Sequence, residues 1–199
     1  FLLGIGGLVS FGHAAYFGGG AYVAALLVTH ANSPMELAFL LAPFGAGLAA
    51  LIIGWICLRL TGVYFAMLTL AFAQLLWSLV FQWGEVTGGD DGLVNIWPSE
   101  WLKASTTFYI FTLIVTVGGI LLMRHVAHSP FGYALRAARD SERRAEATGI
   151  NTKRVRWMAF TLAGVMAGLA GGLFVFSKGS VFPNELEIAR SFDALIVVF

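Results

Sequence analysis

The chain has 199 residues, of which 58% are hydrophobic and only 12% are charged, and its mean hydropathy is +0.81. Soluble domains carry about 25% charged residues, so this composition excludes a soluble domain and indicates a protein that lies in a membrane. The formal net charge of +1 excludes the strongly basic surface expected of a nucleic-acid-binding protein.

The first 29 residues predict a helix that is interrupted near its middle. Residues 1–9 and 14–29 are apolar, and one continuous helix over both runs would measure about 43 Å. The hydrocarbon core of a membrane is only about 30 Å thick, so we expect a break at residues 10–13. Broken helices often line substrate paths, although glycine can equally serve close packing. The candidates for a path in this region are Ser10, His13, Tyr16, Gly18, Gly19 and Gly20.

Four further apolar runs are long enough to cross a membrane as helices. They cover residues 37–58, 60–83, 108–123 and 157–177, and residues 192–199 begin another run. These runs hold no acidic side chain for a proton relay except Asp193, near the start of the last one. If the protein moves a solute uphill, the energy must come from a source other than a proton relay in these runs. Thr69 and Gln74 are further candidates for the path, although such groups more often bond a neighbouring helix.

Basic residues gather in one loop. Residues 124–156 hold eight of the twelve Lys and Arg residues against three acidic ones. By the positive-inside rule this loop lies in the cytoplasm. The turn at Arg59 then lies inside the cell, and residues 84–107 and 178–191 lie outside it. The loops alternate without conflict, which predicts a multi-pass helix bundle.

Small residues recur at intervals of four within two of the apolar runs. They are Gly164, Gly168 and Gly172 in one run, and Ala46, Ala50 and Gly54 in the other. Such rows let two helix backbones approach closely in lipid, where no hydrophobic force draws helices together. The spacing therefore predicts a tightly packed bundle.

Residues 129–150 predict a short amphipathic helix within the cytoplasmic loop. Ser129 before Pro130 indicates the start of a helix, and Gly149 indicates its end. Asp140 is spaced to pair with Arg136 or Arg144. Such a helix could lie on anionic lipid headgroups or insert into a groove on a soluble protein, and its interleaved acids favour the protein. The residues that can share its apolar face are Phe131, Leu135, Ala138 and Ala145.

Several kinds of active site find no support in the sequence. No GxxxxGK[ST] loop is present, so this chain does not bind ATP through that motif. His125 and His128 have no third ligand nearby, and the single cysteine, Cys57, lies in an apolar run. An intramembrane enzyme would need clustered His, Asp or Glu at membrane depth. We therefore expect this chain to hold no catalytic residue, no metal site and no cofactor.

Four segments form a specific set when they are taken together and in order. They are GLVSFGHAAYFGGGAY, RLTGVYFAMLTLAFAQ, TGGDDGL and SPFGYALRAARDSERRAEATGIN. Together they resemble the M-type subunit of the branched-chain amino-acid permease family of ABC importers, over nearly the whole chain. The resemblance implies an all-α integral membrane protein, a polytopic transmembrane helix bundle with a cytoplasmic coupling helix. Residues 1–199 would form a single permease domain truncated at both ends, and residues 129–150 would form the coupling loop within it.

The resemblance also implies a set of partners. A second permease subunit would pair with this one in the inner membrane of a bacterium or archaeon. Two cytoplasmic ATPases would bind ATP and Mg²⁺, and an external binding protein would deliver leucine, isoleucine or valine. Ala145, Glu146, Ala147 and Gly149 resemble the EAA-x-G signature that docks on the ATPase.

Two groups of loop residues take roles from this resemblance. One group would couple the chain to the ATPase: Arg136, Arg139, Asp140, Glu142, Arg143, Glu146 and Gly149. The other group would contact the binding protein or shape the external mouth, unless it is an ordinary turn-rich loop: Gly88, Gly89, Asp90, Asp91 and Gly92.

Two alternatives stay open. ABC permeases for urea or short-chain amides would share every feature described above, because the binding protein sets most of the selectivity. A facilitative channel or carrier that needs no ATPase is the alternative from a different class. That alternative would leave the mixed-charge cytoplasmic helix without a purpose.

Overall fold

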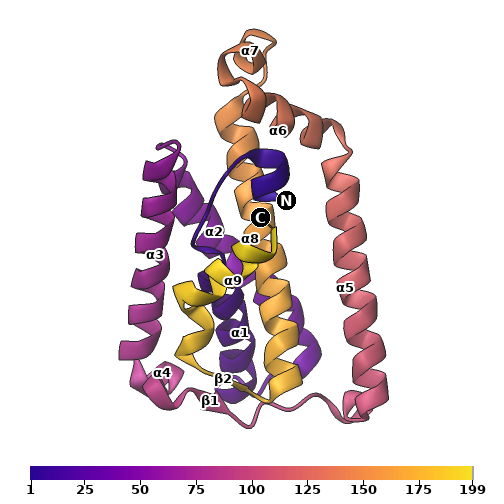
Figure 1. Ribbon diagram of the computed structural model, residues 1–199. Coiled ribbons are helices and arrows are strands. Elements are labelled where there is room, and N and C mark those ends of the chain that lie inside the picture. Colours follow the sequence, from indigo (N-terminus) through magenta and orange to yellow (C-terminus); the bar gives the residue numbers. More distant parts are fainter. Residues whose placement is uncertain (199) are drawn as a thin grey trace.

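A computed structural model describes residues 1–198 of the chain, and helices form most of it (Figure 1). The long helices are α1 (His13–Thr29), α2 (Met35–Cys57), α3 (Val63–Gln82), α5 (Ser105–Ala127) and α8 (Thr152–Lys178). Of these, α2, α3, α5 and α8 are long and apolar enough to cross a membrane. The prediction of an all-α polytopic membrane protein is confirmed.

Short elements connect the long helices. The short helices are η1 (Leu2–Gly6), α4 (Gly84–Thr87), η2 (Gly89–Asp91), η3 (Glu100–Leu102), α6 (Pro130–Asp140), α7 (Glu142–Ala147), η4 (Pro183–Leu186) and α9 (Ile188–Val198). Two short strands, β1 (Leu93–Val94) and β2 (Ser180–Val181), pair antiparallel with Leu93 opposite Val181. The apolar run at residues 192–199 falls in α9, except for Phe199, which lies outside the described residues.

The connecting segments lie at two opposite ends of the molecule. Figure 1 shows α6 and α7 at one end, and α4, β1 and β2 at the other. Arg59 lines a cavity together with Lys153 and Arg154, so the turn between α2 and α3 lies at the α6–α7 end. Exposed tryptophans lie toward both ends of the molecule. Trp55 lies near the α6–α7 end, and Trp83 follows α3 toward the opposite end. Tryptophan prefers membrane interfaces, so the loops alternate between two membrane surfaces.

Helices α1, α2 and α8 form the closely packed centre of the fold. A Cβ atom on Gly164 or Gly168 of α8 would overlap the Cβ atom of Ala50 or Ala46 of α2. On another side of α8, a Cβ atom on Gly20 of α1 would overlap the backbone of Gly168. The absence of side chains therefore sets the distance between these helices.

The predicted break near residues 10–13 is present. Helix η1 ends at Gly6 and is followed by Gly7, whose φ of 64° is the left-handed conformation that glycine adopts without strain. Helix α1 then begins only at His13. Figure 1 shows η1 near the α6–α7 end and α1 running from the middle of the molecule to the β1–β2 end. Residues 7–12 connect the end of η1 to the start of α1.

Helix α5 stands apart from this centre (Figure 1). None of the residues in its most apolar 18-residue window is buried. It meets the remainder of the chain chiefly through η3, α6 and α8. Most of its surface is therefore available to lipid or to another helix.

The prediction of one amphipathic helix over residues 129–150 is wrong. The segment forms two helices, α6 and α7, because Ser141 between them is extended with φ −163° and ψ 105°. The start signal is confirmed, since Ser129 Oγ accepts a hydrogen bond from Gly132 N at 3.5 Å. The Asp140 carboxylate pairs with neighbouring Arg139 at 3.0 Å and not with Arg136 or Arg144, and Arg144 lies beyond the end of α6 in α7.

Candidate functional site

Backbone groups at the break before α1 are bonded by hydroxyl side chains from distant helices. Phe11 N donates to Thr69 Oγ1 of α3 at 3.3 Å, and Ala14 N donates to Ser191 Oγ of α9 at 2.9 Å. Thr69 and Ser191 are both buried. A broken helix within a membrane needs such partners, because lipid offers its backbone no hydrogen bonds.

Ser10 and His13 line a cavity of about 360 Å³ beside this break, together with Ser191. Ser10 Oγ accepts a hydrogen bond from Gly12 N at 3.3 Å. The His13 ring packs edge-on against Tyr16 and Phe160, at 6.0 Å from each ring centre. The cavity wall is otherwise largely apolar, so Ser10, His13 and Ser191 are its few polar groups. This arrangement suits a small solute with an apolar body and a polar end.

The predicted path residues do not all meet at this point. Ser10, His13, Tyr16 and Thr69 gather around the break. Gln74 lies exposed on α3, away from the buried Thr69.

Two of the three consecutive glycines serve packing. A Cβ atom on Gly18 would overlap the Leu186 side chain, and one on Gly20 would overlap Gly168. Only Gly19 has open space beside it. Of the two readings of this run, the contacts of Gly18 and Gly20 favour packing.

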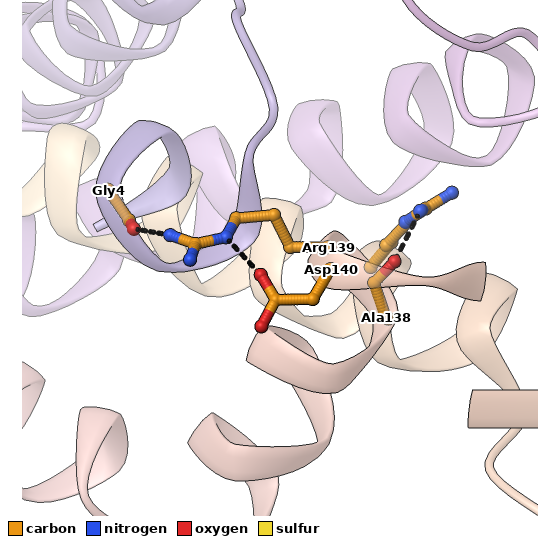
Figure 2. Close-up of polar contacts among 5 residues, drawn as sticks. Gly4, Ala138, Arg139 and Asp140 are labelled. Carbon is orange, nitrogen blue, oxygen red and sulfur yellow. Dashed lines mark hydrogen bonds and ion pairs between the residues drawn. The ribbon is translucent and has the colours of Figure 1, made fainter. Parts of the chain in front are cut away.

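Arg139 connects α6 to the N-terminal segment. Its Nη1 donates to Gly4 O of η1 at 2.6 Å, and its Nε donates to Asp140 Oδ1 at 3.0 Å (Figure 2). The stem of Arg139 lies so close to Gly7 that a Cβ atom there would overlap Arg139 Cγ. Leu135, which is fully buried, packs in the same apolar cluster as Leu2 of η1. The N-terminal segment is thus attached to α6 by polar and apolar contacts.

A second set of contacts joins α6 and α7 to the start of α8. The buried Thr152 Oγ1 lies 3.3 Å from Glu142 Oε1 and 2.9 Å from Glu146 Oε1. Arg156 pairs with Glu142 at 3.2 Å and donates from Nη2 to Ala138 O at 2.9 Å. Two of the predicted coupling residues, Glu142 and Glu146, therefore hold the corner between α7 and α8 together.

Other predicted coupling residues face outward. Arg143 and Gly149 are exposed, and a Cβ atom on Gly149 would meet no neighbour. The φ of 86° at Gly149 ends this part of the chain in a conformation that favours glycine. Arg136 is half-buried, and its guanidinium lies 5.4 Å from the centre of the exposed Tyr133 ring. We call residues 130–149, which form α6, the bend at Ser141 and α7, the α6–α7 corner. These groups form its outer surface.

The glycine-rich segment before β1 forms tight turns at the opposite end. Gly88, Gly89 and Gly92 all have positive φ angles, and a Cβ atom on Gly92 would overlap Val181 O of β2. The side chains of Asp90 and Asp91 are exposed. The turns thus present two carboxylates beside the β1–β2 pair.

Sequence reasoning missed an ion cluster at the β1–β2 end. Glu185 of η4 is 2% exposed and pairs with Lys178 at 3.0 Å and Arg190 at 2.5 Å. Both cations also lie over the ring of Phe174. The cluster joins the end of α8 to the start of α9. An acidic residue seven positions after a lysine in a loop gave no signal that it would be buried.

Within residues 1–198, no group of three or more His, Cys, Asp or Glu side chains is placed to hold a metal ion.

Comparisons with known proteins agree with the resemblance. The family described as "Branched-chain amino acid transport system / permease component" matches residues 1–199. The high-affinity branched-chain amino acid transport system permease protein LivM of Escherichia coli is 27% identical over 225 residues, covering 99% of this chain and 53% of the relative. A probable branched-chain amino acid transport permease protein LivH of Methanocaldococcus jannaschii is 33% identical, covering 46% of this chain and 28% of the relative.

A third relative carries a different name. The autoinducer 2 import system permease protein LsrC of Photorhabdus laumondii is 27% identical over 128 residues, covering 64% of this chain and 37% of the relative. No solved structure matches the chain. The chain spans about half the length of the LivM relative. Because the family match covers all of residues 1–199, the chain belongs to the family of branched-chain amino acid transport system permease components.

Proposed function

We propose that this chain is part of the permease subunit of an ATP-driven importer for branched-chain amino acids. The observation that carries the proposal is the α6–α7 corner, which is attached both to the broken segment before α1 and to the central helix α8. The family membership and the names of the LivM and LivH relatives support it. The chain itself is not an enzyme in this proposal.

The first connection runs from α6 to the cavity. Arg139 holds η1, and residues 7–12 lead from η1 to Ser10 and His13 at the cavity wall. A displacement of α6 therefore pulls on the segment that borders the cavity. Alternating access requires that such a segment can adopt two different packed arrangements.

The second connection runs from α6 to the bundle. Arg156 and Thr152 tie the α6–α7 corner to the first two turns of α8. Because α8 packs on α1 and α2 through glycine and alanine, a tilt of α8 moves these helices together. The corner thus acts as a lever on the bundle.

The lever needs an external source of energy. In the proposal one of two cytoplasmic ATPases docks on the outward face of the corner, where Arg136, Arg143 and Gly149 lie, and both ATPases bind ATP and Mg²⁺. A second permease subunit completes the path, and an external binding protein docks at the β1–β2 end near Asp90 and Asp91. Residues 124–156 then lie in the cytoplasm, and the protein lies in a bacterial or archaeal inner membrane.

Reconstituted transport tests the proposal. The full-length protein is reconstituted in liposomes with the permease and the ATPases that neighbouring genes encode, and the binding protein is supplied. Uptake of labelled leucine and of labelled urea is then measured with and without ATP. We expect leucine uptake that requires ATP. Uptake of urea alone would assign the chain to amide transport, and leucine uptake without ATP would support a channel or carrier.

A further inference from the structure

A long apolar groove lies at the α6–α7 end, on the surface of α8. It encloses about 540 Å³, and its walls come from α2, α5, α6 and α8. Leu51, Val126, Phe131, Leu162 and Val165 are among the side chains that line it. A groove of this kind at membrane depth suits an acyl chain, because its walls offer almost nothing polar.

A second cavity of about 520 Å³ adjoins the groove. It is lined by Trp55, Leu58, Arg59, Lys153, Arg154 and Trp157. Trp157 lines both cavities and so forms a wall that they share. The indole Nε1 of Trp157 donates to Leu51 O at 2.9 Å, which fixes the ring between them. An apolar compartment thus lies beside a cationic one, with Trp157 as their shared wall.

The three cations of the second cavity have no acidic partner within 4.0 Å among the described residues. By contrast, Arg139, Arg156 and Lys178 each pair with a carboxylate. Arg59 lies over the Trp55 ring at 4.0 Å from its centre, so it is held at the cavity wall. Like charges around one cavity repel each other, and an anion between them removes that repulsion.

We propose that these two cavities together bind one anionic phospholipid, with its phosphate headgroup at Arg59, Lys153 and Arg154 and an acyl chain in the apolar groove. The charge and the shape of the site both fit this ligand, and basic pockets between helices at a membrane surface are known to take such headgroups. A bound lipid would brace α2 against α8 beside the α6–α7 corner. The inference needs only the membrane location of the chain and not its substrate.

Lipid binding to the purified full-length protein tests the inference. Native mass spectrometry counts the lipids retained when phosphatidylglycerol or phosphatidylcholine with the same acyl chains is titrated into detergent. Two charges are removed by the double variant Arg59→Gln/Arg154→Gln. The matched control, Arg124→Gln/Arg144→Gln, removes two exposed cations from the same loop end but outside the cavity. A third variant, Leu162→Trp, fills the apolar groove without changing any charge.

We expect the wild-type protein to retain phosphatidylglycerol in preference to phosphatidylcholine. The Arg59→Gln/Arg154→Gln variant should bind phosphatidylglycerol about thirty-fold more weakly, and the control should bind it as the wild type does. Leu162→Trp should weaken binding of both lipids.

Several results would overturn the inference. Equal retention of the two lipids would show that the cations do not select a headgroup, and an equal loss in the control would show a general charge effect. Displacement of the lipid by inorganic phosphate at millimolar concentration would show that the groove contributes nothing. If the charge variant keeps phosphatidylglycerol but loses a copurifying ATPase, the cations belong to a protein contact.

Discussion

Glycine and alanine determine how closely the central helices of this protein approach. The sequence predicts this role for Gly164 and Gly168 from their spacing, and the structure places both directly against alanines of α2. Spacing does not reveal that Gly168 also faces α1, because that contact depends on where the break before His13 places the helix. The residue types were therefore predictable, but their partners on a third helix were not.

Gly168 is the residue at which added volume should cost most. Gly168→Val should lower the stability of the full-length protein by about 1–3 kcal/mol or more, because a Cβ atom there already overlaps Ala46 of α2, while the Gly168 backbone also lies against Gly20 of α1. Gly118→Val on α5 is the matched control, since a Cβ atom there meets no neighbour. Thermal unfolding in detergent measures both variants. Equal midpoints for the two would contradict the packing described for α8.

The ion pairs of the chain should differ widely in how much they contribute to the stability of the fold. Glu185→Gln should destabilise the protein by about 1–3 kcal/mol, because the buried carboxylate is held by Lys178 and Arg190. Glu100→Gln should change stability by less than about 1 kcal/mol, since its pair with Lys103 is exposed. The same unfolding measurement compares them. A larger loss at Glu100 would mean that burial does not govern these pairs.

At the scale of the element, the α6–α7 corner shows what local signals can and cannot predict. Ser129, Pro130 and Gly149 predicted the limits of the segment, because caps act through neighbouring residues. The extended Ser141 was missed, although serine and aspartate readily compete for backbone hydrogen bonds and favour helix ends. Glu142 and Glu146 received a coupling role by resemblance, but their bonds to Thr152 depend on the bend at Ser141.

Breaking the contact between α6 and η1 should separate ATP hydrolysis from transport. Arg139→Gln removes the guanidinium that donates to Gly4 O, so movement of α6 would no longer pull on the segment beside the cavity. We expect leucine uptake per ATP hydrolysed to fall about tenfold, the effect of losing one charged hydrogen bond, while hydrolysis continues. Paired assays of uptake and phosphate release in liposomes measure this ratio. A parallel loss of both activities would instead place Arg139 at the ATPase contact.

For the whole molecule, composition and charge predicted the spans and their alternation, because both follow from the membrane as a solvent. The contacts that shape the cavity were not predictable, since they join segments far apart in sequence. Ser191 and Thr69, which bond the break before α1, come from α9 and α3. The β1–β2 pair likewise joins residues 93–94 to residues 180–181. Only the tertiary fold brings these groups together.

In the proposed function, the outward face of the α6–α7 corner receives an ATPase. Full-length wild-type protein and its Arg143→Glu variant would be purified from native membranes in mild detergent, and the copurifying proteins would be quantified. We expect the wild type to carry an ATPase and a second permease. The variant should retain the second permease, but the amount of copurifying ATPase should fall about tenfold. Arg143 is exposed, and reversing its charge would repel the docking partner. A wild-type protein that purifies alone and transports leucine without ATP would show that no ATPase docks on this corner to drive transport.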